Sequence, residues 1–215
     1  MSRLFHNIML CLTALAACAV VTFSAVAFAV EQPEQGDGFG HLTEAVAAQI
    51  ESTAEESFAP SMEHAKKQAK AAAKRAAVKD EALLRARQEG SATDYCLAVD
   101  ISAKRTIVMK WNGDDWEVVK YWICSTGAPD MPTLTGVYEV GDRGYAFGDG
   151  YTCYYYTQYC GNYLFHSIKY EPDTFDVQDG RLGEAVSEGC VRLKLENAKW
   201  IYDNIPGSTR VIVYE

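Results

Sequence analysis

Hydrophobic and polar positions divide the chain into three stretches of different character. Residues 8–30 are almost entirely apolar, residues 30–93 mix Ala with Glu, Lys and Gln, and residues 94–215 are rich in β-branched and aromatic side chains broken by turn residues. A segment with few aromatic side chains buries too little surface to offset the entropy lost on ordering. We therefore expect one compact domain of normal size at 94–215, preceded by a linker at 30–93.

Short strands dominate the prediction for the domain. Runs of β-branched and aromatic residues predict strands at 95–99, 105–111, 116–122, 137–140, 163–166 and 211–214. Asn112-Gly113 follows the second run and is a strong hairpin signal. The single clear helix, 195–204, stops before Pro206-Gly207. The fold class is therefore mainly β (α+β), with one C-terminal helix and a helical linker in front.

The linker consists of two blocks of opposite charge. Residues 30–58 hold seven acidic side chains and no Lys or Arg, whereas residues 62–89 hold eight basic and four acidic ones, and Pro60 separates the blocks. Strong helix formers fill the second block up to Gly90, which predicts a solvated helix about 28 residues and roughly 40 Å long. We interpret it as a spacer. Its basic face could also dock on an anionic membrane or wall polymer, although a solvated face is more common.

The first 29 residues predict export. Arg3 precedes the apolar run, which ends in Ala27-Phe28-Ala29, as in a secretory signal peptide cut after Ala29. The run is also long enough for an uncleaved membrane anchor. Cleavage as a lipoprotein at Cys18 is less favoured, because the residues after it stay apolar. Each alternative places the rest of the chain on the extracellular or cell-wall side.

Charge and composition exclude several functions. The net charge of −9 repels phosphate backbones, so we expect no nucleic-acid partner. No set of His, Cys, Asp and Glu has zinc-ligand spacing beyond chance, and no Gly-rich phosphate loop follows a strand. We therefore predict no metal and no cofactor. Contact with a membrane is expected only through the N-terminal anchor.

The cysteine count is odd in the exported part. Removing Cys11 and Cys18 from the chain's seven cysteines leaves five, so two disulfides would leave one free thiol. Cys153 and Cys160 could form a local bridge or be small buried hydrophobes. The sequence leaves both alternatives open.

Cys190 is the candidate for a free, reactive thiol. Gly189 permits a tight backbone path whose N–H groups could point at one spot, and Arg192 could favour thiolate or hold a substrate carboxylate. A cysteine nucleophile needs a base, and His166 is the only histidine of the predicted domain. A buried structural cysteine and a strand histidine with a satisfied hydrogen bond are the alternatives.

Four segments carry a resemblance to a known family. Phe165-His166-Ser167, followed by the segment 187–193 with sequence SEGCVRL, resembles the active-site signature of the L,D-transpeptidase catalytic domain, also called YkuD-like. The segments 132–138 and 198–207 resemble that family's upstream motif and its closing helix and turn. The resemblance covers residues 94–215 and implies a β-sandwich or barrel.

The resemblance also implies an activity on peptidoglycan stem peptides. Cys190 would attack the third stem residue, release D-alanine and form a thioester, which an amine of a neighbouring stem would resolve into a 3-3 cross-link. His166 would be the base and the Ser167 carbonyl would orient its ring. The N–H groups of Gly189 and Cys190 would form the oxyanion hole. Carbapenems would acylate Cys190.

The remaining candidate residues have supporting roles in this hypothesis. Ser187 would support the turn, Arg192 would hold the cysteine loop or a substrate carboxylate, and Tyr163 and Phe165 would support the site or contact substrate. The tyrosines between residues 151 and 159 could line the substrate path or pack on the sheet. Both alternatives remain open.

One residue departs from the family pattern. Glu188 stands where the family usually has His, and a carboxylate near the sulfur disfavours thiolate unless it points outward or pairs with a base such as Arg192. Two other functions therefore stay open. Water could resolve the thioester, which would make the protein an L,D-carboxypeptidase, or Cys190 could be disabled in a non-catalytic wall-binding domain.

Overall fold

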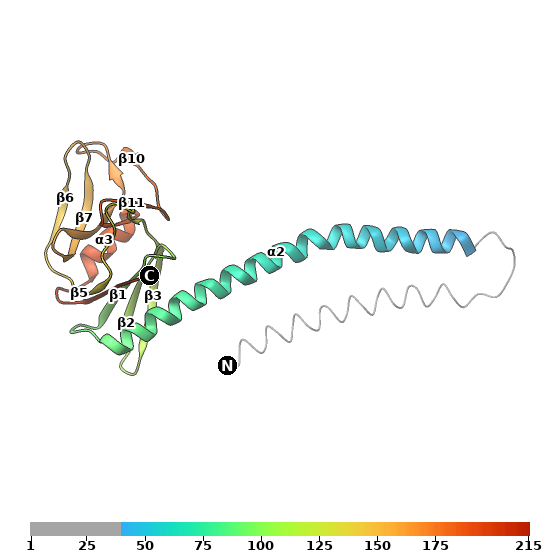
Figure 1. Ribbon diagram of the computed structural model, residues 1–215, viewed down its shortest axis with the longest axis horizontal. Coiled ribbons are helices and arrows are strands. Elements are labelled where there is room, and N and C mark those ends of the chain that lie inside the picture. Colours follow the sequence, from blue (N-terminus) through green and yellow to red (C-terminus); the bar gives the residue numbers. More distant parts are fainter. Residues whose placement is uncertain (1–39) are drawn as a thin grey trace. The chain divides into compact units, whose positions relative to one another are not determined.

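The computed structural model describes the backbone of residues 40–215 and the side chains of residues 61–215. The signal peptide or anchor predicted at 1–29 lies outside the described residues. The helices in this range are α2 (Gly40–Glu89) and α3 (Leu195–Asn204) (Figure 1). The strands in this range are β1 (Tyr95–Asp100), β2 (Arg105–Trp111), β3 (Trp116–Ile123), β4 (Thr126–Gly127), β5 (Gly136–Glu139), β6 (Arg143–Phe147), β7 (Cys153–Cys160), β8 (Tyr163–Ser167), β9 (Lys169–Tyr170), β10 (Val177–Asp179), β11 (Ala185–Ser187), β12 (Val191–Leu193) and β13 (Arg210–Tyr214). The mainly β fold class is confirmed.

A five-stranded sheet forms the scaffold, in the order β3-β2-β1-β13-β5. Its strands pair antiparallel except for β1 and β13, which run parallel. The alternation of side chains along β1 sends Leu97 and Val99 to one face and Cys96 and Ala98 to the other. Because both faces are covered, β1 is buried along almost its whole length.

The main core lies where this sheet packs against a second, four-stranded sheet and α3. The second sheet has the order β12-β8-β7-β6, and its β12–β8 pair is parallel. Phe165 of β8 and Ile201 of α3 are fully buried in the same apolar cluster as Leu97. The site described below is built on β8 and on the loop that enters β12.

The C-terminal part of α2 corrects the interpretation of a wholly solvated spacer. Val78, Ala82 and Ala86 are buried and pack with Cys96 and Ala98 on the outer face of the five-stranded sheet. Their spacing of four residues forms one helix stripe, and small side chains allow the helix to approach the strands closely. Residues Ala65–Glu215 therefore form one compact unit.

Two further points concern α2. The helix continues through Pro60, which sequence reasoning placed at a boundary between two blocks. Residues 61–77 are exposed, as the solvated-face interpretation expects. Among the described residues, no helix combines the length and the hydropathy needed to span a bilayer.

Candidate active site

The loop that carries Cys190 depends on the glycine before it. Gly189 has a φ of +108°, in the left-handed region that side chains avoid, and a Cβ there would lie 2.5 Å from Cε1 of Tyr163. Glycine therefore permits this backbone path, which leads from β11 to β12 and leaves Cys190 partly exposed. The Cys190 Sγ lies 3.5 Å from the Asn162 carbonyl oxygen.

Two buried hydroxyl groups hold the loop in place. Ser187 Oγ donates to the Cys190 carbonyl at 2.6 Å and accepts from the Gly189 N–H at 3.2 Å. Thr133 Oγ1 donates to the Gly189 carbonyl at 2.7 Å and accepts from the Gly127 N–H at 2.8 Å. Ser187 contacts the turn as expected. Sequence reasoning assigned no role to Thr133, although it lies in the 132–138 segment.

The backbone donors near the sulfur differ from the expected pair. The Gly189 N–H already donates to Ser187, whereas the Cys190 N–H has no acceptor among residues 61–215. A donor without a partner can serve a developing oxyanion without first breaking a bond. The Cys190 N–H is therefore the available donor of the two.

His166 lies on β8 and is almost completely buried. Its Nδ1 is 2.6 Å from the Ser167 carbonyl oxygen, and Phe147 packs edge-on against the ring with centroids 5.2 Å apart. A carbonyl oxygen only accepts, so Nδ1 carries the proton and Nε2 is left as an acceptor. Ser167 thus lies where it can fix both the tautomer and the orientation of the ring.

Burial keeps both the Cys190 thiol and the His166 imidazole uncharged at neutral pH. Burial lowers the pKa of His166 to about 4, with smaller contributions from the positive charges of Arg192 and Lys169. Burial also raises the pKa of the Cys190 thiol, although a backbone hydrogen bond to Leu164 opposes the shift. The resting pair is therefore a thiol and an uncharged imidazole, and a proton must move when the sulfur attacks.

Cys190 and His166 line the same hollow, which has a volume of about 210 Å³. Residues from β6, β7, β8, β9, β11 and β12 and from the loops between them surround it: Phe147, Tyr151, Cys153, Asn162, Leu164, His166, Lys169, Ser187, Glu188, Cys190 and Arg192. The parallel register of β12 and β8 places Arg192 opposite His166, so the cysteine loop that precedes β12 lies at the start of β8, with Cys190 beside Leu164 and two positions before the level of His166. A candidate nucleophile, a candidate base and an available backbone donor thus belong to one site.

Arg192 has a partner that sequence reasoning missed. It is 1% exposed, and its Nη1 lies 2.7 Å from Oδ2 of Asp179 at the end of β10. The hydrogen bonds from Arg181 and Arg192 hold the pKa of the Asp179 carboxyl well below its usual range. Arg192 also exchanges backbone hydrogen bonds with Ser125. It therefore pairs with Asp179 rather than with Glu188.

Glu188 pairs with Lys169, although the two are separated by 19 positions in the sequence. Lys169 Nζ lies 3.8 Å from Glu188 Oε1 and 3.9 Å from the centroid of the Tyr151 ring. The charge of Glu188 contributes to the raised pKa of Cys190. Glu188 therefore lines the hollow with a 67% exposed side chain, and the base with which it pairs is Lys169 rather than Arg192.

The other aromatic candidates divide between the core and the hollow. Phe165 is fully buried against Tyr159 and does not line the hollow, so its contribution is packing. Tyr163 packs beside Gly189 and also lies outside the lining. Tyr151 lines the hollow, whereas Tyr154 and Tyr159 are buried, so both interpretations of the tyrosine cluster hold for part of it.

The five cysteines of residues 61–215 are free thiols. Cys153 and Cys160 lie at opposite ends of β7, so their Cα atoms are about 20 Å apart at the usual rise per residue. A disulfide needs a separation of about 4.4–6.8 Å, which excludes the local bridge. Burial raises the pKa of Cys153 to about 12, in keeping with a small buried side chain.

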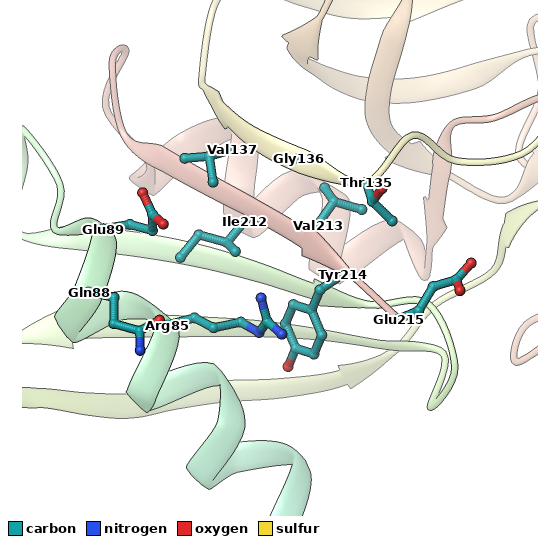
Figure 2. Close-up of a pocket in the computed structure, with 10 residues that line it drawn as sticks. All are labelled: Arg85, Gln88, Glu89, Thr135, Gly136, Val137, Ile212, Val213, Tyr214 and Glu215. Atoms are coloured by element: carbon teal, nitrogen blue, oxygen red, sulfur yellow. The ribbon is translucent and has the colours of Figure 1, made fainter.

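A larger hollow of about 520 Å³ lies where the end of α2 meets β13 and β5 (Figure 2). Arg85 covers the ring of Tyr214 there, with its Cζ 4.3 Å from the ring centroid. None of the residues lining it is a cysteine or a histidine. The smaller hollow at Cys190 is therefore the candidate active site.

Comparison with known proteins identifies the class to which this fold and site belong. Residues 94–213 match the model of the L,D-transpeptidase catalytic domain family, called YkuD. The chain belongs to this family.

Individual relatives match over part of their length. The Bacillus subtilis (strain 168) protein YciB, assigned as an L,D-transpeptidase, is 40% identical over 55 residues, which are 25% of this chain and 28% of YciB. A solved structure from Clostridium acetobutylicum ATCC 824, described as a fused Zn-dependent amidase/peptidase/peptidoglycan-binding domain-containing protein, is 37% identical with a TM-score of 0.53, and the match covers 65% of this chain and 59% of that one. An L,D-transpeptidase from Mycobacterium smegmatis is 23% identical with a TM-score of 0.47, over 57% of this chain and 59% of that one. The chain thus spans less than two thirds of each of these relatives.

Proposed function

We propose that this protein is a peptidoglycan L,D-transpeptidase that forms 3-3 cross-links through a thioester on Cys190, with His166 as the base. The observation that carries the proposal is that Cys190 and His166 line one hollow. The Ser167 carbonyl binds Nδ1 of His166, which leaves Nε2 as the acceptor for a proton. Membership of the L,D-transpeptidase catalytic domain family supports the reaction class. The substrates are the stem peptides of peptidoglycan.

The geometry supports a first step in which the proton and the sulfur move together. Because the thiol and the imidazole are both neutral at rest, the Cys190 proton passes to Nε2 as the sulfur attacks the carbonyl of the third stem residue. The Cys190 N–H donates to the resulting oxyanion. The bond to D-alanine then breaks, and His166 returns the proton to the leaving amine, which leaves a thioester.

The second step regenerates the thiol. The amine of a neighbouring stem attacks the thioester, so a C–N bond forms as the C–S bond breaks. One amine proton returns through His166 to the sulfur. The proposed substrate lies outside the cytoplasmic membrane, which agrees with the export that the N-terminal sequence predicts; we include an extracellular or cell-wall location in the proposal.

Incubation of the full-length protein with disaccharide tetrapeptide, followed by mass spectrometry, tests the proposal. We expect a cross-linked dimer and free D-alanine from the wild type, and a loss of at least about a thousandfold in Cys190→Ala and His166→Ala, since the nucleophile and the base act as one unit. Cys160→Ala is the matched control because Cys160 does not line the hollow, and it should retain full activity.

Three other outcomes would contradict the proposal. Tripeptide without dimer would mean that water resolves the thioester and that the protein is a carboxypeptidase. Equal turnover in Cys190→Ala and wild type would place the nucleophile elsewhere. The absence both of turnover and of a covalent carbapenem adduct on the folded protein would leave a non-catalytic domain.

A further inference from the structure

The hollow beside Cys190 contains a single carboxylate, that of Glu188. The Glu188 side chain is 67% exposed, and one of its carboxylate oxygens, Oε1, faces Lys169 at 3.8 Å. The pair with Lys169 is the one ion pair of this carboxylate among residues 61–215. An exposed carboxylate with one cationic partner, directly before the Gly-Cys pair, can receive a second cation.

The cationic side chains of the same hollow are already occupied. Arg192 is buried and bound to Asp179. Lys169 is held between the Tyr151 ring and Glu188, and its side chain is 22% exposed. Glu188 is the more exposed member of its pair with Lys169, so an incoming molecule meets the carboxylate before it meets the ammonium group.

A negative charge at this point affects the two steps of an acyl transfer differently. It disfavours the first step, because it makes the Cys190 thiolate more costly. It favours the second step when the acceptor is an amine, because an amine arrives as an ammonium ion and two opposite charges about 4 Å apart attract even in water. Water, the competing acceptor, carries no charge and gains nothing.

We propose that Glu188 is the acceptor-selecting residue of this site: its carboxylate holds the ammonium group of a primary-amine acceptor beside the Cys190 thioester, and Lys169 fixes the position of that carboxylate. The inference rests on the proposed function and specifies the acceptor of its second step. The ammonium releases one proton to solvent, the free amine forms the C–N bond as the C–S bond breaks, and the second proton passes through His166 to the sulfur.

The test measures how the acyl-enzyme divides between amine and water. Wild type, Glu188→Gln and the matched control Glu184→Gln are acylated with disaccharide tetrapeptide and offered a disaccharide tripeptide as the amine acceptor. Glu184 is exposed on the same segment and does not line the hollow. Hydroxylamine, which is uncharged at neutral pH, is the acceptor in a parallel series. Mass spectrometry gives the ratio of aminolysis to hydrolysis in each case.

We expect the amine-to-water ratio to fall about fivefold in Glu188→Gln and to stay unchanged in Glu184→Gln. The hydroxylamine-to-water ratio should be equal in all three proteins, and acylation of Glu188→Gln should be faster than that of wild type. High salt should lower the amine preference of the wild type and of Glu184→Gln but not that of Glu188→Gln.

Two results would overturn the inference while leaving the proposed function intact. The first is an unchanged amine-to-water ratio in Glu188→Gln, and the second is an equal loss with hydroxylamine, which would mean that the variant changes geometry rather than charge. A wild-type protein that forms no acyl-enzyme would overturn the proposed function and this inference together.

Discussion

The two sheets of the domain differ in the kinds of side chain that they bury. The five-stranded sheet buries apolar side chains on both faces, against the main core on one side and the end of α2 on the other. The four-stranded sheet buries apolar side chains too, but it adds a cluster of buried polar and charged groups: His166, Ser167 and Arg192. Each of these three has a hydrogen-bond partner. The difference indicates that one sheet mainly supplies stability, whereas the other accepts the cost of burying polar groups around the proposed pair of Cys190 and His166.

The comparison predicts its largest effect at α2. A fragment that starts at Asp94 lacks Val78, Ala82 and Ala86 and exposes the outer face of the five-stranded sheet. We expect its free energy of unfolding to be about 4 kcal/mol lower than that of a fragment that starts at Ala65, because several apolar side chains lose their cover. Urea denaturation of the two fragments measures the difference.

Two point variants test whether α2 stabilises the domain by packing on the sheet, without removing any part of the chain. Ala82→Leu overfills the contact with the sheet, whereas Ala73→Leu lies on the exposed part of the same helix. The former should be destabilising and the latter close to neutral. Equal stability of the two fragments, and of the two variants, would mean that the helix is a spacer after all.

The next largest effect concerns pH and the four-stranded sheet. The pKa of His166 is about 4 in the folded protein and ordinarily 6.5, so the unfolded chain binds a proton in the window between these values and the folded protein does not. Stability should therefore fall by about 3 kcal/mol as the pH drops from 6.5 to 4.

His166→Gln is the control for this pH dependence. Removing the titrating group should flatten the stability curve in that window, measured by urea denaturation at several pH values. The half-buried carboxylate Asp179 has its pKa lowered below the usual range, so it loses its charge only at more acidic pH. An identical slope in wild type and His166→Gln would show that His166 is not held neutral.

The smallest of these effects tests the polar bracing of the cysteine loop. Thr133→Val removes one hydroxyl and leaves the Gly127 N–H and the Gly189 carbonyl without that partner, which should cost about 2 kcal/mol of stability. Thr133→Ser keeps the hydroxyl and should restore most of the loss. Acylation kinetics of both variants show whether the brace also positions Cys190, since Val alone should slow the attack.

The sequence predicted the strands of the five-stranded sheet better than those around the candidate site. The strands 95–99, 105–111 and 116–122 match β1, β2 and β3 closely, because a strand paired with its chain neighbour and covered on its faces keeps a plain apolar pattern. The short strands β9–β12 were not predicted, since two or three residues carry no period. Val78, Ala82 and Ala86 are spaced four residues apart, as one face of a helix requires. The pattern did not stand out because α2 contains many other alanines.

The site residues divide in the same way. Cys190, Gly189 and His166 could be chosen from local residue types and from the family resemblance. Asp179, Lys169 and Thr133 could not, because each meets its partner across a gap in sequence that only the folded sheet closes. The Glu188 side chain is exposed and pairs with a base, as expected, but that base is Lys169 of β9 rather than Arg192, and the sequence did not reveal β9.

The parallel pairing of β1 with β13 has a consequence for folding during synthesis. β1 is the first strand of the domain, and one of its two neighbours in the sheet, β13, is formed by residues more than a hundred positions later. The scaffold therefore cannot close while the ribosome is still adding the residues of β13, and contacts of such long sequence separation form slowly. A polypeptide in this open form can still be threaded through a narrow channel, which fits a protein whose work is proposed to lie beyond the membrane.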